Sequence, residues 1–312
     1  MKKEVLYTLK APYRDDLRIT GYKFGRGPKK AACIMGAIRG NEIQQLYVCS
    51  QLIRELKKLE KNNCILHDNE IMVIPSINNY SMNINRRFWT VDNTDINRMF
   101  PGDKNGETAE RIAGNVFEKV QGYTYGIQFA SFYMPGKFVP HVRMMKTGYH
   151  SESLANLFGL PYVVLRTPNP YDTKTLNYNW QMWQTNAFSV YTNSTTQIDE
   201  ESAKHAVVSV LRFLTRMGII KYNCHSGYIA SIIEENKLKT IRTNKAGFYK
   251  RLKEPGDAVY RGEVLGRIYD PYEGEIISEV ISPTEGIIFF AHVEPTVVEN
   301  NVVYKIIKRI HT

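Results

Sequence analysis

Hydrophobic and polar residues follow two different periods along the beginning of the chain. Residues 17–24 alternate between the two kinds, which predicts a half-buried β-strand, and the apolar run 31–35 predicts a fully buried one. From Asn41 the apolar residues recur every three or four positions as far as Leu56, the period of an amphipathic helix. Another apolar run follows at 70–75. A strand, a helix and a strand in this order predict two parallel neighbours in an α/β sheet.

The same two periods continue as far as Gly218. They predict a helix from Asp199 to Gly218, a shorter helix over 108–120, and strands over 125–131, 161–165 and 187–191. Residues 78–106 are rich in Asn, Asp and Arg and show neither period. A long irregular loop inside a compact domain is usually functional. We therefore expect an α/β fold with a mixed or parallel sheet flanked by helices, and a functional site that uses this loop.

The pattern of hydrophobic and polar residues changes after Gly218. Short alternating runs separated by glycines follow one another, as in 256–268, 283–290 and 302–307. Short strands with turns between them are typical of a small antiparallel β domain. We expect an α/β domain over residues 1–222 and a smaller, barrel-like β domain over residues 223–312.

Composition narrows the class of protein. The 312 residues are 43% hydrophobic, which allows a sizeable core, but the longest apolar runs are too short to cross a bilayer. No apolar signal core follows the basic N-terminus, and the four cysteines show no C-x-x-C spacing, so we expect a cytoplasmic protein. The net charge of +10 comes from scattered basic residues. We expect neither a nucleic-acid nor a membrane partner, although such a field can steer small anions.

Two motifs carry the candidate chemistry. The first runs from Gly36 to Glu42 (Gly-Ala-Ile-Arg-Gly-Asn-Glu), and the second runs from Asp95 to Gly102 (Asp-Ile-Asn-Arg-Met-Phe-Pro-Gly). With these motifs in this order and the C-terminal β segment, nearly the whole chain resembles the succinylglutamate desuccinylase/aspartoacylase family. The resemblance implies a carboxypeptidase-like fold, a C-terminal domain similar to a biotinyl/lipoyl barrel, and zinc-dependent hydrolysis of an amide bond.

The zinc site that the resemblance implies is altered in this chain. The family takes zinc ligands from a His and a Glu in the first motif and from a His at a strand end; here Arg39, Glu42 and Ala130 stand at those positions. Arginine has no lone pair to give a metal, and a catalytic zinc normally has three protein ligands. Tyr191 stands at the position of the family's general base, and a tyrosine side chain is a poor base at neutral pH. Two ligands and the base are therefore substituted together.

The part of the site that the resemblance assigns to the substrate carboxylate is retained. It implies that Arg87, Asn97 and Arg98 bind the ligand, with Arg166 as a further contact. The planar guanidinium group suits this role because it binds a carboxylate through two parallel hydrogen bonds. The alternative for Arg98 is a salt bridge that stabilises the domain.

Arg39 and Glu42 are three residues apart at the start of a predicted helix, so we expect an ion pair between them. Arg39 could then replace the metal as an electrostatic anchor for a ligand oxygen. His141 and His150 could instead complete a rebuilt metal site with Glu42, although each is also compatible with a hydrogen-bonded loop histidine.

Two functions remain open. In the first, the chain binds a small carboxylate-bearing ligand, such as an acylated amino acid or peptide, without standard zinc hydrolysis. Alternatively, it is a metal-dependent hydrolase of N-acyl amino acids or peptides that uses a rebuilt site. The family implies zinc as cofactor, and the substituted ligand positions argue against it.

Overall fold

The structure is a computed structural model that describes residues 1–12 and 14–308. The chain forms two compact units. Unit 1 comprises Met1–Ser131 and Pro140–Ile232, and unit 2 comprises Phe132–Val139 and the chain from Ile233 onward. The domain limits expected from the sequence, an α/β domain over 1–222 and a β domain over 223–312, stay a prediction.

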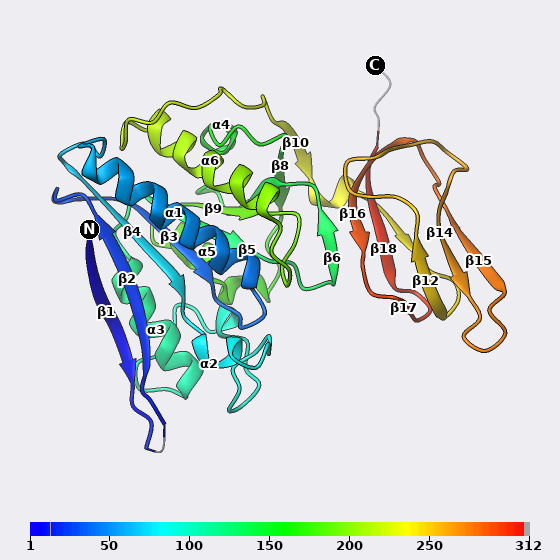
Figure 1. Cartoon of the computed structure of the whole chain (residues 1–312), viewed down its shortest axis with the longest axis horizontal. Coiled ribbons are helices and arrows are strands. Elements are labelled where there is room, and N and C mark those ends of the chain that lie inside the picture. Colours follow the sequence, from blue (N-terminus) through cyan, green and yellow to red (C-terminus); the bar gives the residue numbers. More distant parts are fainter. Residues whose placement is uncertain (13, 309–312) are drawn as a thin grey trace. The chain divides into compact units, whose positions relative to one another are not determined.

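Unit 1 is built on a sheet of nine strands in the order β1-β2-β4-β3-β5-β9-β7-β8-β10 (Figure 1). Strands β4, β3, β5 and β9 are parallel neighbours, whereas β7 runs antiparallel to β9 and β1 and β2 form an antiparallel edge. The strands are β1 Lys2–Leu9, β2 Leu17–Phe24, β3 Lys29–Ala37, β4 Asn69–Ser76, β5 Tyr125–Ala130, β7 His141–Met145, β8 Tyr162–Arg166, β9 Asn186–Tyr191 and β10 Ser231–Glu234.

Helices cover both faces of this sheet (Figure 1). Helices α1 and α6 pack on one face, and α3 and α5 pack on the other. The helices are α1 Ile43–Lys61, α2 Asn79–Met82, α3 Thr108–Val120, α4 Glu152–Asn156, α5 Leu176–Met182 and α6 Glu200–Arg216, with 3₁₀ helices η1 Ile96–Arg98, η2 Asp172–Lys174 and η3 Glu235–Lys237. The arrangement confirms the predicted α/β class with helices on both sides of a mixed sheet.

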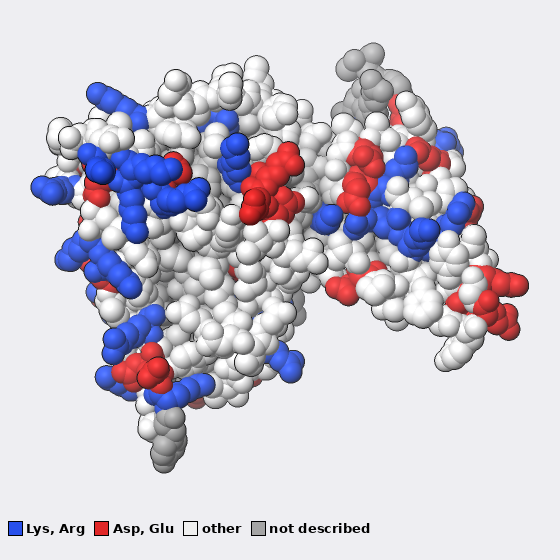
Figure 2. All heavy atoms as spheres, viewed as in Figure 1, with Lys and Arg blue, Asp and Glu red and all other residues white. Residues whose placement is uncertain are grey.

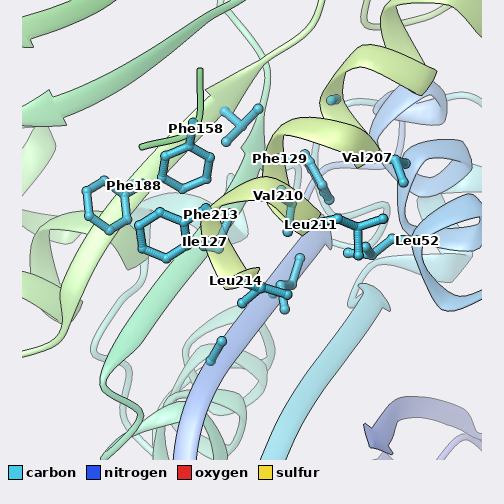
Figure 3. Packing of buried hydrophobic residues seen from close by; sticks show 14 of the residues in the cluster. Leu52, Ile127, Phe129, Phe158, Phe188, Val207, Val210, Leu211, Phe213 and Leu214 are labelled. Carbon is cyan, nitrogen blue, oxygen red and sulfur yellow. The ribbon is translucent and has the colours of Figure 1, made fainter. Parts of the chain in front are cut away.

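Unit 1 has one hydrophobic core on each face of the sheet, because successive side chains along a strand point to opposite faces. In β5, Ile127 and Phe129 face α1 and α6, together with Phe188 of β9. Figure 3 shows these side chains packed against Leu211 and Phe213 of α6. The rings of Phe158 and Phe213 stack with their centroids 4.3 Å apart. This apolar layer makes the sheet a rigid platform, so that the loops at the carboxyl ends of β3, β5 and β9 have fixed starting points.

Unit 2 consists of two packed antiparallel sheets. One contains β11, β18, β16 and β13, with β6 paired to β16, and the other contains β15, β14, β12 and β17. The strands are β6 Gly136–Phe138, β11 Lys239–Arg242, β12 Gly247–Arg251, β13 Ala258–Val259, β14 Val264–Tyr269, β15 Ile276–Ile281, β16 Gly286–His292, β17 Thr296–Val297 and β18 Val302–Lys308. The antiparallel β structure predicted for the C-terminal region is present, and β6 joins it from a segment between β5 and β7.

We expect His292 to make the stability of unit 2 dependent on pH. Its side chain is buried in β16, and its Nε2 atom has no hydrogen-bond partner within the described part of the chain. Burial lowers the pKa of His292. When the pKa of a histidine is lower in the folded state than in the unfolded state, the protein has its full free energy of unfolding above the unfolded-state pKa of about 6.5. The free energy of unfolding decreases as the pH falls below that value, because the unfolded state then binds the proton more readily.

We therefore expect the unfolding temperature to fall as the pH is lowered from about 7.5 to about 5, because protonated His292 is unfavourable in the folded state. The variant His292→Gln should show a flatter dependence in calorimetric melts, whereas His205→Asn, at an exposed position of α6, should follow the wild type. Identical pH dependence for the wild type and His292→Gln would contradict this assignment.

Charged side chains are mixed over the surface. On the face drawn in Figure 2, Lys and Arg side chains form several separate groups with Asp and Glu side chains among them. This agrees with the interpretation of the net charge as scattered basic residues. Within residues 1–12 and 14–308, no helix is long and apolar enough to cross a membrane.

Candidate functional site

The first motif forms the turn between β3 and α1, and its Glu42 is completely buried. The Oε2 atom of Glu42 accepts hydrogen bonds from the backbone N–H groups of Ile38 at 2.8 Å and Arg39 at 3.0 Å. Its Oε1 atom accepts from Nη1 of Arg39 at 3.2 Å and from the hydroxyl group of Ser131, which follows β5. Both carboxylate oxygens are therefore engaged, and the turn is closed around them.

The guanidinium group of Arg39 lies between two carboxylates. Besides the contact with Glu42, its Nη2 atom lies 2.9 Å from Oδ2 of Asp95 and its Nε atom 3.0 Å from Oδ1. The predicted ion pair between Arg39 and Glu42 is confirmed, and Asp95 is a second partner that the sequence analysis did not identify. Burial alone would lower the pKa of Arg39, but the two carboxylates outweigh it and the net shift is upward. Arg39 is thus a permanent, buried and compensated cation.

Asp95 connects this ion pair to the second motif. Its side chain caps the 3₁₀ helix η1 by accepting from the N–H group of Asn97 at 3.0 Å. The side-chain oxygen of Asn97 in turn accepts from the N–H group of Leu176 at 3.2 Å, at the first residue of α5. Because Arg98 ends the same 3₁₀ helix, the conformation of the Asn97-Arg98 pair depends on Asp95.

Arg98 and Arg166 meet at Asp172. The Nη1 atom of Arg98 lies 3.5 Å from Oδ1 of Asp172 and 2.6 Å from the carbonyl oxygen of Tyr171. The Nε and Nη2 atoms of Arg166 lie 3.1 Å and 3.0 Å from Oδ2 of Asp172. Both arginine side chains remain partly exposed, by 32% and 21%, so each can also reach a ligand. The structure therefore brings these two predicted residues together through an acidic residue that the sequence analysis did not identify.

Arg87 belongs to the same electrostatic environment. Burial lowers the pKa of Arg87 to about 10; the positive charges of Arg39 and Arg98 act in the same direction, and Glu42 and Asp95 oppose them. Its carbonyl oxygen accepts from the N–H group of Gly40 at 3.1 Å, which ties the loop after β4 to the first motif. A guanidinium group whose charge is disfavoured by its surroundings is stabilised when an anion binds beside it.

Ala130 and Tyr191 end the neighbouring strands β5 and β9 as register partners. The imidazole of His141 stacks on the ring of Tyr191, with centroids 4.7 Å apart and an interplanar angle of 3°. Arg143 of β7 donates from Nη1 to the Tyr191 hydroxyl group at 3.3 Å. The sequence analysis did not identify Arg143, although a charged residue between the apolar Val142 and Met144 was a usable signal.

The residues at the implied zinc positions do not fit that metal. Arg39 is a cation without a lone pair, Ala130 has no side-chain donor, and both oxygens of Glu42 already accept two hydrogen bonds each. No group of three or more His, Cys, Asp and Glu side chains that could hold a metal occurs among the residues that the structure describes. His141 lies in its stack with Tyr191, and Nδ1 of His150 has no hydrogen-bond partner in the described ranges.

The fold is shared with solved structures of low sequence identity. A succinylglutamate desuccinylase from Silicibacter sp. TM1040 superposes with a TM-score of 0.80 and 16% identity, covering 97% of this chain and 92% of that one. A succinylglutamate desuccinylase/aspartoacylase from Rhodobacter sphaeroides gives 0.80 and 16%, covering 99% and 96%. The product-bound ectoine utilization protein EutE (DoeB) from Ruegeria pomeroyi gives 0.75 and 16%, covering 93% and 89%.

Sequence comparison assigns the family. No curated protein matches this sequence. The family model of the succinylglutamate desuccinylase/aspartoacylase catalytic domain matches residues 28–215, more than half of the chain, including both motifs and the ends of β3, β5, β7 and β9. The chain therefore belongs to the succinylglutamate desuccinylase/aspartoacylase family.

Proposed function

We propose that this protein binds a small ligand with a free carboxylate, such as an acylated amino acid or peptide, and does not carry out standard zinc-dependent hydrolysis. One observation carries the proposal. The guanidinium group of Arg39 lies between Glu42 and Asp95, where it engages the single retained zinc-ligand side chain. A bound zinc ion would have to displace a buried cation from two carboxylates.

The retained arginines provide the binding chemistry. Arg98 and Arg166 both pair with Asp172, whereas Arg39 engages Glu42 and Asp95. The partly exposed guanidinium groups of Arg98 and Arg166 can bind a carboxylate in the bidentate manner. A bound anion would also favour the charged form of Arg87, whose pKa is lowered by burial and by the neighbouring cations. Asn97 has its side-chain oxygen engaged by the N–H group of Leu176, which leaves its amide N–H₂ group as the ligand donor.

In this proposal Arg39 acts mainly through Asp95. Three of the five N–H groups of a guanidinium group point at carboxylates here. The ion pair holds Asp95, and Asp95 holds the turn that carries Asn97 and Arg98. The site therefore keeps a cation where the family places its metal, and this cation orients the carboxylate-binding residues.

Metal analysis and calorimetry test the proposal together. We expect protein purified without chelators to contain well under one zinc per chain, and to bind N-acetyl-L-aspartate or N-succinyl-L-glutamate without cleaving it. Arg98→Ala should weaken binding roughly 10- to 100-fold, because a charge-assisted hydrogen bond contributes about 1.5–3 kcal/mol.

Arg111→Ala is the matched control, since Arg111 is exposed on α3. It should leave the affinity unchanged. Stoichiometric zinc together with release of the acyl group would overturn the proposal in favour of a rebuilt metal site. Equal affinity of the wild type and Arg98→Ala would place the ligand elsewhere.

A further inference from the structure

Buried polar side chains form a band across three neighbouring strands of the sheet, β5, β9 and β7. Residues opposite each other in neighbouring strands share a face. Gln128 of β5 is the register partner of Ser189 of β9, which is the register partner of Arg143 of β7. All three side chains are buried. On β3 the same face is apolar, because Met35, the partner of Gln128, belongs to the hydrophobic core.

Helix α5 covers this band. It packs on β9 and β5. A Cβ atom added to Gly126 of β5 would lie 2.6 Å from the indole ring of Trp180. On the other flank of the helix, Gln181 donates to the carbonyl oxygen of Met145 at the end of β7, at 3.1 Å. Asn177 is one helical turn before Gln181 and so lies on the same side of α5, nearer to the end of the helix that contacts Asn97.

Two atoms in this layer have unmet hydrogen-bonding capacity. The Nδ2 atom of Asn177 and the Oε1 atom of Gln181 are inaccessible and have no partner among the described residues. The two residues are 2% and 1% exposed. An unpaired buried polar group is unfavourable, so buried polar groups are almost always paired with other protein groups or with ordered water. Because no protein group in the described part of the chain pairs with these two atoms, their partner is water or a ligand.

We propose that Asn177, Gln181, Gln128 and Ser189 form a subsite that takes a neutral hydrogen-bonding group of the ligand, a carboxamide in the first instance. This rests on the proposed carboxylate site, which positions the rest of the ligand. A carboxamide oxygen can accept from Nδ2 of Asn177, and its N–H₂ group can donate to Oε1 of Gln181. A carboxylate has no hydrogen to donate to Gln181, and an apolar side chain would leave both atoms unpaired.

The helix connects the subsite to the carboxylate site. Its first residue, Leu176, donates to the side chain of Asn97, and the preceding turn contains Asp172, which holds Arg98 and Arg166. A ligand held by its carboxylate at Arg98 would therefore lie toward the end of α5 that contains Asn177. The acylated amino acid that fits both sites best has a side chain ending in an amide.

Calorimetry with three probes tests the subsite: N-acetyl-L-glutamine, N-acetyl-L-glutamate and N-acetyl-L-methionine. We expect the wild type to bind the glutamine derivative roughly tenfold more tightly than the other two, because a site built for hydrogen bonds rejects analogues that cannot make them. Asn177→Leu should remove this preference and leave the affinity for N-acetyl-L-methionine within about twofold. Gln128→Leu is a second variant with the same expected direction, should Asn177→Leu unfold.

Gln51→Leu is the matched control, because Gln51 lies on α1, the helix that packs on the opposite face of the sheet. It should keep the preference. Equal binding of all three probes, abolished by Arg98→Ala, would overturn the subsite, leave the carboxylate site standing and indicate that only water pairs with Asn177 and Gln181. A preference for the amide that persists in both folded variants would also overturn the subsite. Binding of none of the probes would overturn the subsite and the proposed function together.

Discussion

Replacing Arg39 with alanine is expected to lower the free energy of unfolding by about 3–5 kcal/mol, because removal of one partner leaves buried charges uncompensated. Glu42 is completely inaccessible, and the Asp95 side chain is only 16% exposed. Without the guanidinium group, both carboxylates would lie beside each other with their main countercharge removed. Equilibrium unfolding in urea measures the effect. Guanidinium chloride is unsuitable as the denaturant because the guanidinium ion could occupy the vacated position.

Arg54→Ala is the control for this measurement. The Arg54 side chain is 65% exposed and lies 3.6 Å from Glu55, and such surface pairs contribute about 0–1 kcal/mol. The triple variant Arg39→Ala, Glu42→Gln, Asp95→Asn should recover part of the lost stability, since it removes the uncompensated charges. If Arg39→Ala alone were as stable as Arg54→Ala, the buried ion pair would not hold the site together. Millimolar guanidinium should raise the unfolding temperature of Arg39→Ala and not that of the control.

The double variant Arg39→His, Ala130→His is expected to acquire about one zinc ion per chain, because it restores three protein ligands. The structure brings the three positions together: Arg39 contacts Glu42, and Glu42 accepts from the hydroxyl group of Ser131, next to Ala130. Removal of the arginine also removes one of the two hydrogen bonds that Oε1 of Glu42 accepts. Metal analysis after dialysis, together with zinc-dependent thermal shifts, would detect the site.

Each single variant serves as a control for the double variant. Arg39→His alone provides two protein ligands, and Ala130→His alone leaves the guanidinium group in place, so both should bind zinc far more weakly. A double variant with no more zinc than the wild type would show that the side chain at position 130 does not face Glu42. The gain of metal would not by itself restore hydrolysis, because Tyr191 still occupies the position of the base.

Local sequence patterns predicted the helices and strands that have one buried apolar face and one polar face. The apolar positions of α3 and α6 recur at the helical period because one side of each helix packs on the sheet, and the alternation in β2 reflects one buried face. The strand β7 was not predicted because buried polar residues, His141 and Arg143, interrupt its apolar pattern. Strand β6 has three residues and belongs to unit 2, so nothing local distinguishes it from a loop.

The sequence by itself determined the family, the predicted carboxylate-binding residues and the ion pair between Arg39 and Glu42. Each of these depends on a motif or on a spacing of three residues, so the residues involved are close together in the sequence. Only the tertiary structure decided that Asp95 is the second partner of Arg39, that Asp172 joins Arg98 to Arg166, and that Asn177 and Gln181 lie over a polar band of the sheet. The physical reason is that buried charges and amides must find partners wherever the fold places them, at separations that no local pattern records.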